Sequence, residues 1–305
     1  MRTFDPCRSV QSVVKKDRMK RLPHTTPPVW PKIPAGRFAA TIRSDSPGGC
    51  AIALLGLPDD TGVKFNHGRA GAKAGPAAFR AALARYGTAS PDLPWVFDAG
   101  DVKPGRNLVE THRRVTEATA ALLAAGLFPI AVGGGHGLTF PFVRAVAAKH
   151  PQLAGLYFDA HLDVRETAGS GMAFRKLVEE CGVRALHLHG FRPLVNSPAH
   201  LKWFRQQGGR IYADWTRLAL PRAKDLFVSF DLDVLDAAYA PGVSALNPAG
   251  WNVSLAGTWV RACGEDRRVH CFDLMELNPR FDPDGRTARI AAHLFLTFLS
   301  GFAQR

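Results

Sequence analysis

The stretch LAGLYFDAH, residues 153–161, begins as an apolar run of β-forming residues and ends in Asp159 and His161. A continuous apolar run of this kind is typical of a strand that is covered on both faces of a sheet. Several of the other segments that we predict as strands have the same continuous character. The complete set of other predicted strands is CAIALLGLP (50–58), WVFDAG (95–100), LFPIAVGGG (127–135), ALHLHGF (185–191), RIYAD (210–214), DLFVSFDLD (225–233) and RVHCFDLMEL (268–277).

Helical segments alternate with these strands. GPAAFRAALARYG (75–87) has Pro76 in its first turn and Gly87 just past its end, and residues 107–126 end in Gly126. Proline at the start and glycine after the end are typical helix boundaries. Eight strands separated by helical crossovers predict an α/β fold with a doubly wound parallel sheet. Because ligands bind outside the carboxyl ends of the strands in such sheets, we expect the functional residues there.

The composition indicates one large α/β domain. The 305 residues are 46% hydrophobic, which is enough for a sizeable core. No apolar run approaches the roughly 20 residues that span a membrane, and the N-terminus lacks the apolar segment of a secretory signal. The five cysteines are scattered without a C-x-x-C pair, which argues against a disulfide framework and against a thiolate zinc site. We therefore expect a cytoplasmic protein that does not bind membranes.

The net charge of +13 is unevenly distributed along the chain. Residues 1–45 contain ten Lys or Arg residues and three Asp residues, so more than half of the excess lies in this proline-rich segment. Its basic residues are not interleaved with aromatic residues, as they are in proteins that bind single-stranded nucleic acid. We predict a flexible basic extension over residues 1–46, a single domain over residues 47–305, and no nucleic-acid partner.

Three of the predicted strand ends carry residue types that commonly bind metal ions. They are His136 in GGGHG, Asp159, His161 and Asp163 in DAHLD, and Asp231 and Asp233 in FDLD. Alternate residues of a strand point to the same side, so each segment can direct several ligands at one point. Taken singly, each motif has an ordinary structural explanation, and only their combination at three strand ends indicates a metal site.

Charge balance favours two metal ions at these strand ends. Four carboxylates in one cleft would repel each other strongly unless cations neutralised their charge, and two divalent cations would do so. The ligand atoms are all oxygen or nitrogen, which favours Mn²⁺ and leaves Fe²⁺, Zn²⁺ and Ni²⁺ as alternatives.

Four segments resemble, in order and spacing, the signature segments of the arginase (ureohydrolase) family. They are GGGHG (133–137), DAHLD (159–163), SFDLD (229–233) and MELNP (275–279). The resemblance runs from about residue 50 to residue 300. It implies a three-layer α/β/α sandwich around an eight-stranded, mainly parallel sheet, and assembly as a homotrimer or hexamer. It also implies two Mn²⁺ ions, bridged by hydroxide, on the six ligand positions named above.

The resemblance also assigns roles in catalysis and substrate binding. Asp163 would be both a metal ligand and the carrier of a proton to the leaving nitrogen, and Glu276 would bind the cationic C–N group of the substrate. Arginases and agmatinases usually carry a further histidine in the loop after D-A-H-x-D, but residues 164–177 contain none. SGMAFRKL (170–177) is instead similar to the SGTPFR segment of formimidoylglutamases. This similarity implies a substrate contact by Ser170. Arg165 and Arg175 lie in the loop expected above the metals, and either could bind a substrate carboxylate. Arg175 could equally be an outward residue at the start of a helix over FRKLVEECG (174–182).

We therefore expect a metal-dependent hydrolase of a C–N bond in a linear amidine. The favoured substrate is N-formimidoyl-L-glutamate, from histidine breakdown, with glutamate and formamide as products. A hydrolase of arginine, agmatine or a guanidino acid, releasing urea, is the alternative. Zinc-dependent deacetylases have a related sheet but use fewer ligands, and a non-catalytic metal-binding scaffold would be expected to have lost ligands. All six ligand residues are present here.

Overall fold

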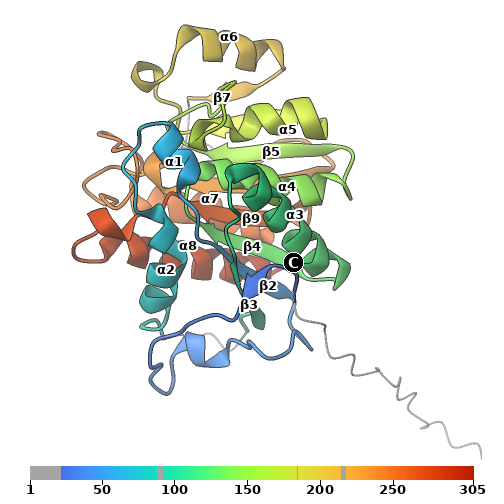
Figure 1. Ribbon diagram of the computed structural model, residues 1–305, viewed down its shortest axis with the longest axis vertical. Helices are drawn as coiled ribbons and strands as arrows, with labels where there is room; N and C mark the ends of the chain where they lie inside the picture. The colour runs from blue at the N-terminus through green and yellow to red at the C-terminus, as the bar shows by residue number, and fades with distance from the viewer. Residues whose placement is uncertain (1–21, 88–91, 184, 214–217) are drawn as a thin grey trace, which may run out of the picture.

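The computed structural model describes residues 22–87, 92–183, 185–213 and 218–305. Helices cover both faces of a central sheet, giving the predicted three-layer α/β/α sandwich (Figure 1). The strands are β1 Thr25–Thr26, β2 Ile52–Leu57, β3 Val96–Val102, β4 Phe128–Gly133, β5 Leu153–Phe158, β6 Leu186–His189, β7 Arg210–Tyr212, β8 Asp225–Asp231 and β9 Val269–Met275. The α-helices are α1 Thr61–Phe65, α2 Gly75–Leu83, α3 Leu108–Ala124, α4 Thr139–Ala147, α5 Ala173–Cys181, α6 Pro198–Gln206, α7 Val253–Glu265 and α8 Arg286–Phe302. None of the helices in these residues is both long and apolar enough to cross a membrane.

In the described part of the chain the sheet has nine strands, in the order β1-β3-β2-β4-β9-β8-β5-β6-β7. All neighbouring strands are parallel except β1, which runs antiparallel to β3. The eight strands predicted from the sequence correspond to β2 through β9, although residue 214 of the RIYAD segment lies outside the described residues. The additional strand, β1, has only two residues, and a strand so short has no detectable pattern in the sequence.

Parts of residues 22–46 contact the sheet, although most of this segment is exposed or half-buried and its predicted flexibility stays a prediction. β1 adds an edge to the sheet beside β3, Leu22 is buried on one face of the sheet, and Phe38 is buried on the other. The backbone N–H of Phe38 also donates to the carbonyl of Tyr86 at 2.9 Å. A few apolar side chains therefore anchor a segment whose proline and charge content suggested flexibility. Residues 1–21 lie outside the described residues, and the domain boundary at residue 46 stays a prediction.

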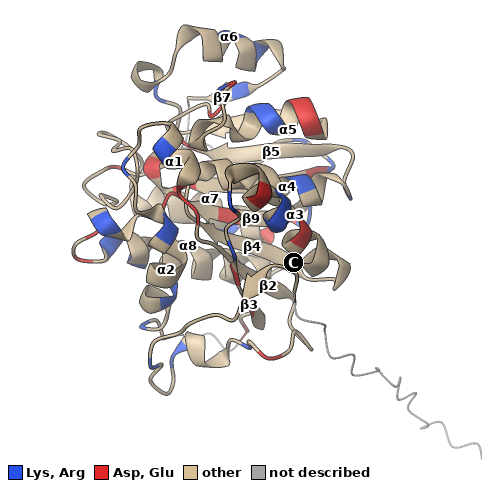
Figure 2. Cartoon of the chain, in the orientation of Figure 1, with Lys and Arg blue, Asp and Glu red and all other residues tan. Residues whose placement is uncertain are grey.

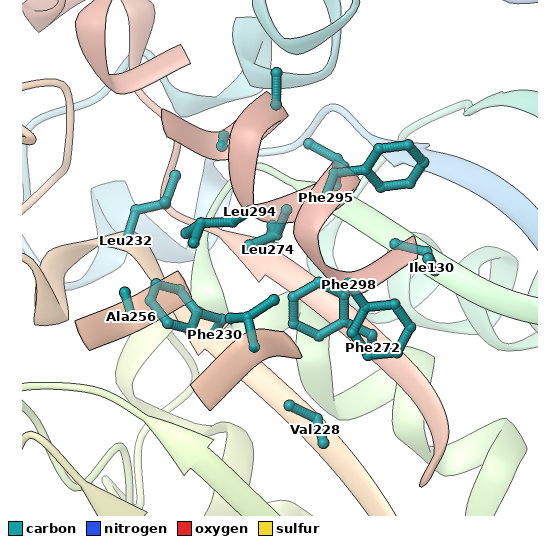
Figure 3. Close-up of a cluster of buried hydrophobic side chains, with 14 of the residues drawn as sticks. Ile130, Val228, Phe230, Leu232, Ala256, Phe272, Leu274, Leu294, Phe295 and Phe298 are labelled. Carbon is teal, nitrogen blue, oxygen red and sulfur yellow. The ribbon is translucent and has the colours of Figure 1, made fainter. Parts of the chain in front are cut away.

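Two hydrophobic clusters hold the layers together, one on each face of the sheet. Along β2, Ile52 belongs to the first cluster and Ala53 to the second, as the alternation of side chains in a strand requires. The first cluster joins α2, α7 and α8 to the sheet, and Figure 3 shows Phe272 of β9 beside Phe298 of α8. These two rings stack with their centroids 4.5 Å apart. The second cluster joins α3, α4, α5 and α6 to the opposite face. Burial of both faces explains why the strand segments are continuously apolar.

Strands β4, β9, β8 and β5 are consecutive neighbours in the sheet, and their carboxyl ends lie at one edge. β5 follows β4 in the chain but is not its neighbour in the sheet, because β9 and β8 lie between them. Such a change in strand order leaves a crevice at the carboxyl ends, where α/β proteins bind their ligands. The fold therefore brings the predicted ligand segments together at this edge.

Candidate two-metal active site

The structure brings all six predicted metal ligands together at the carboxyl ends of these strands. The Nδ1 atom of His136 lies 3.1 Å from Asp159 Oδ2, 3.0 Å from Asp163 Oδ2 and 3.0 Å from Asp231 Oδ2. These four residues form the first of two groups at this edge of the sheet whose ligand atoms converge. Atoms that surround one metal ion at about 2 Å are themselves about 3 Å apart, so this spacing suits a single ion.

The second group contains Asp159, His161 and Asp233. The Nδ1 atom of His161 lies 3.3 Å from Asp159 Oδ1 and 3.1 Å from Asp233 Oδ2. Asp159 belongs to both groups, and it faces each group with a different oxygen. The geometry therefore supports two neighbouring ions that share the carboxylate of Asp159.

Buried polar atoms without hydrogen-bond partners show that these residues fit metal ions. Among the described residues, His136 Nδ1, Asp159 Oδ2 and Asp233 Oδ1 are buried and have no hydrogen-bond partner. Burial, followed by the charges of Asp163 and Asp233, raises the pKa of Asp159 to about 6. Burial and the neighbouring Asp233 likewise raise the pKa of Asp231 well above its ordinary value. Buried, unpaired carboxylates are costly, and divalent cations would compensate for both the missing partners and the repulsion.

A hydrogen-bond network behind His136 fixes the orientation of its ring. The Nε2 atom of His136 lies 2.9 Å from the hydroxyl of Ser229, which donates to Asp273 Oδ1 at 2.6 Å. The hydroxyl of Thr139 donates to Asp273 Oδ2 at 3.0 Å. A histidine that donates from Nε2 to Ser229 keeps the Nδ1 lone pair free for a metal, so this network supports the ligand role of His136.

Asp163 and Glu276, the two predicted catalytic residues, both have left-handed backbone conformations, with φ of 48° and 67°. This region is unfavourable for residues other than glycine and is often found at functional sites. Glu276 Oε1 accepts the backbone N–H of His136 at 2.7 Å, and its Oε2 accepts the hydroxyl of Ser244. Burial raises the pKa of Glu276 to about 7, although these hydrogen bonds oppose the increase. Glu276 therefore lies directly beside the metal groups.

A cavity of about 160 Å³ opens above the two groups, and this volume suits a small molecule rather than a polymer. Two of the predicted substrate-binding residues, Arg165 and Ser170, line this cavity. A hydrogen bond of 2.9 Å joins the Ser170 hydroxyl to the side-chain amide of Asn66, which also lines the cavity.

Arg175, the third predicted substrate-binding residue, is not among the residues that line the cavity, and its position fits the alternative of an outward residue near the start of a helix. Its guanidinium pairs with Glu179 at 2.8 Å and with Glu166 at 3.1 Å, and it lies over the ring of Trp203. Figure 2 shows basic residues early in α5 and acidic residues near its end, the arrangement that produces the pair with Glu179. The charge of Arg175 is therefore already balanced by its neighbours.

Several cavity and support residues were not found from the sequence. They are Asn66, Asn196, His200 and Ser244 on the cavity wall and Thr139, Ser229 and Asp273 behind His136. One signal was available, because Ser229 precedes Asp231 by two positions and so shares its side of β8. The wall residues come from loops and helix ends, which carry no periodic signal.

A third convergent group lies at the opposite edge of the sheet and contains His150, Asp225 and His270. Here the two imidazole rings stack with centroids 3.7 Å apart, and both approach Asp225 Oδ1, at 3.3 Å and 2.7 Å. His270 Nε2 forms a hydrogen bond with Asp225 Oδ1, and no atom of this group is among the buried, unpartnered polar atoms found at the cavity, so hydrogen bonding explains the cluster.

Comparison with known proteins identifies the family. A sequence profile described as the arginase family matches residues 50–301. The chain belongs to the arginase family. It is thus a hydrolase of C–N bonds in linear amidines or guanidines, as the sequence predicted.

Relatives with two different activities are similar to this arginase-family chain. A formimidoylglutamase of Ralstonia nicotianae is 35% identical over 297 residues, covering 88% of this chain and 91% of the relative. The mitochondrial guanidino acid hydrolase of Homo sapiens is 34% identical over 281 residues, covering 83% of this chain and 79% of the relative. Among solved structures, Trypanosoma cruzi formiminoglutamase with Mn²⁺ aligns with a TM-score of 0.82 and 29% identity, covering 90% of this chain and all of that one.

Proposed function

We propose that the chain hydrolyses the C–N bond of a linear amidine that carries a carboxylate, with N-formimidoyl-L-glutamate as the favoured substrate. The products are L-glutamate and formamide. The observation that carries this proposal is the position of Arg165 on the wall of the cavity above the two metal groups. Within the described residues no carboxylate forms an ion pair with its guanidinium, so the cation remains available for an acidic substrate. The similarity to several formimidoylglutamases supports the same substrate.

The cofactor that we propose is a pair of Mn²⁺ ions, with other divalent metals as alternatives. His136, Asp159, Asp163 and Asp231 would hold one ion, and Asp159, His161 and Asp233 the other. Two bound cations would lower the pKa of a water molecule between them and so supply a nucleophile near neutral pH. The oxygen-rich ligand set suits Mn²⁺, and the Mn²⁺-containing structure of the Trypanosoma cruzi enzyme supports this choice.

The residues of the chain have complementary roles in the proposed reaction. Glu276 holds the cationic amidine group by a charge-assisted hydrogen bond, and its contacts with His136 and Ser244 fix its carboxylate in place. Asp163 takes a proton from the attacking water and delivers it to the leaving nitrogen, which departs as the amine of glutamate. Arg165 binds a carboxylate of the substrate and so places the amidine carbon over the metal groups.

The direct test is an assay of the Mn²⁺-reconstituted protein against formimidoylglutamate, arginine, agmatine and several guanidino acids. Formamide, glutamate and urea are quantified separately. We expect glutamate and formamide from formimidoylglutamate in equal amounts and no urea from the other substrates. Urea from a guanidino acid would instead support the alternative reaction, which the similarity to the human guanidino acid hydrolase favours. Asp231→Asn is the control, since it removes a ligand of the first ion and should weaken the binding of that ion and abolish turnover.

The proposed setting is histidine breakdown in the cytoplasm, with the protein assembled as a homotrimer or hexamer. This part of the proposal rests on the resemblance to the family. Light scattering of the Mn²⁺-loaded protein measures its mass, and a monomer would contradict the expected assembly.

A further inference from the structure

Two side chains that line the cavity have unused hydrogen-bond donors. Arg165 comes from the loop after β5, and His200 comes from the first turn of α6. Within the described part of the chain, neither side chain forms a hydrogen bond or ion pair. The neighbouring wall residues differ, because Asn66 and Ser170 are already bonded to each other. The donors of Arg165 and His200 are therefore available to a molecule in the cavity.

The start of α6 is tied firmly to the segment that carries the metal ligands. Asn196 Oδ1 accepts the backbone N–H of Leu162 at 2.9 Å, and its Nδ2 donates to the carbonyl of Ala160 at 2.9 Å. The next residue, Ser197, caps α6 by accepting the backbone N–H of His200 at 3.1 Å. Asn196 lines the cavity, but its side-chain amide is already used in these hydrogen bonds. His200 thus projects from a helix end that is fixed relative to His161 and Asp163.

The charges around His200 favour an anionic ligand on its side of the cavity. Arg165 and Arg175 are its cationic neighbours, and Asp163 and Glu166 are its acidic neighbours. Glu166 is paired with Arg175, and Asp163 faces the first metal group, so Arg165 is the charge left free beside the imidazole. Burial, followed by the nearby Arg165, lowers the pKa of His200. The imidazole offers an N–H donor in either protonation state, so its hydrogen bond does not require a charge.

We propose that His200 is a substrate-binding residue that, with Arg165, forms a carboxylate-binding subsite in the wall of the cavity. This inference rests on the proposed amidine hydrolase function and assigns the far end of its substrate. The guanidinium supplies charge and the imidazole supplies a second, directional donor, and a carboxylate can accept from both. A substrate with a cationic amine at its far end would meet the charge of Arg165 unfavourably. The subsite therefore selects acidic amidines over amines.

The test compares His200→Leu and His200→Gln with wild type and with His293→Gln, a matched control at an exposed histidine of α8. With formimidoylglutamate, His200→Leu should raise KM about tenfold or more and change kcat little, because it removes a hydrogen bond to a charged group. His200→Gln keeps a side-chain N–H and should recover most of the loss. With N-butylformamidine, which has no carboxylate, wild type and His200→Leu should have the same kcat/KM.

Calorimetric binding of L-glutamate to the Mn²⁺-loaded proteins gives a second readout that does not depend on turnover. We expect affinity to fall about tenfold in His200→Leu and to stay at the wild-type value in His293→Gln. Unchanged KM and unchanged glutamate affinity in His200→Leu would overturn the subsite, even if the wild type hydrolyses formimidoylglutamate. Equal losses in His200→Leu and His200→Gln would overturn hydrogen-bond donation by His200. A wild type that hydrolyses no amidine, yet loses glutamate affinity on His200→Leu, would refute the proposed reaction and support the subsite.

Discussion

Replacement of Ser229 by alanine tests whether the network behind His136 controls metal binding. The hydroxyl connects His136 Nε2, at 2.9 Å, to Asp273 Oδ1, at 2.6 Å, and all three side chains are buried. Ser229→Ala removes both hydrogen bonds, and water has no ready access to replace them. Without these hydrogen bonds the ring of His136 can also adopt the tautomer in which Nδ1 carries the proton and cannot bind a metal.

The expected magnitude comes from these two hydrogen bonds. Loss of a hydrogen-bond partner by a buried polar group costs about 1–3 kcal/mol, and loss of a partner that orients a metal ligand weakens metal binding about 10- to 100-fold. A 10- to 100-fold change corresponds to about 1.4–2.8 kcal/mol, so the two estimates agree. The weakening should affect only the ion that His136 binds, because Asp159, His161 and Asp233 do not contact Ser229.

The assay is calorimetric titration of metal-stripped protein with Mn²⁺ at pH 7.5. Wild type should show two tight sites, and Ser229→Ala should show one tight site and one that is weaker by the factor given above. Ser300→Ala is the control, since the Ser300 hydroxyl donates to Leu296 within α8, far from the metal ligands in the chain. Two sites of wild-type affinity in Ser229→Ala would refute the reasoning. Equal weakening of both sites would also refute it, because the argument assigns the loss to His136 alone.

Glu276→Gln should lower kcat/KM about 10- to 100-fold, because it removes the charge that holds the amidine. Thermal stability should stay near that of the wild type, because the amide oxygen still accepts the backbone N–H of His136. A wild-type value of kcat/KM would contradict the proposed role of Glu276. Gly134→Ala should destabilise the protein by about 1–3 kcal/mol in urea unfolding, because the added Cβ would lie 2.0 Å from the Asp59 carbonyl oxygen. An unchanged urea midpoint would show that the turn can accommodate the added methyl group. Burial lowers the pKa of His112 and of His189 to about 4. Between about pH 6.5 and pH 4 the unfolded chain therefore binds protons that the folded chain does not, and stability should fall with decreasing pH by about 1.4 kcal/mol per unit for each histidine. A pH-independent free energy of unfolding over this range would exclude this effect.

The metal ligands could be predicted because each one follows directly from a strand. Asp231 comes at the end of β8, and His136 follows β4 after a short glycine turn. Parallel pairing then brings these strand ends to one edge, so local sequence and one general rule of sheet topology were sufficient. The same rule explains why β2 through β9 could be predicted, whereas the two-residue β1 could not.

The support and wall residues could not be predicted, because they depend on contacts between distant segments. Ser229 looks like an ordinary strand residue, and only the register that pairs β8 with β9 places it opposite Asp273. His200 comes from a helix far along the chain from Asp163, and no local pattern points to the cavity. Arg175 is a different case. Glu179 lies four residues after it in α5, and this spacing is a known signal for an ion pair along a helix.

The site has two parts, the metal-ligand groups, which we call the floor, and the surrounding cavity wall. The floor determines the type of reaction, and we propose that the wall determines which substrate is bound. The floor is formed by residues at strand ends, and these match the family motifs throughout. The wall comes from loops and from the start of α6, where backbone and side chains are freer to differ between relatives. This division explains why a formimidoylglutamase and a guanidino acid hydrolase are similar to the chain at 35% and 34% identity. Overall identity mainly reports the shared fold and floor, so it cannot separate the two activities. Arg165 and His200 line this wall, and the carboxylate subsite that we propose for them would favour acidic amidines and guanidino acids over amines such as agmatine.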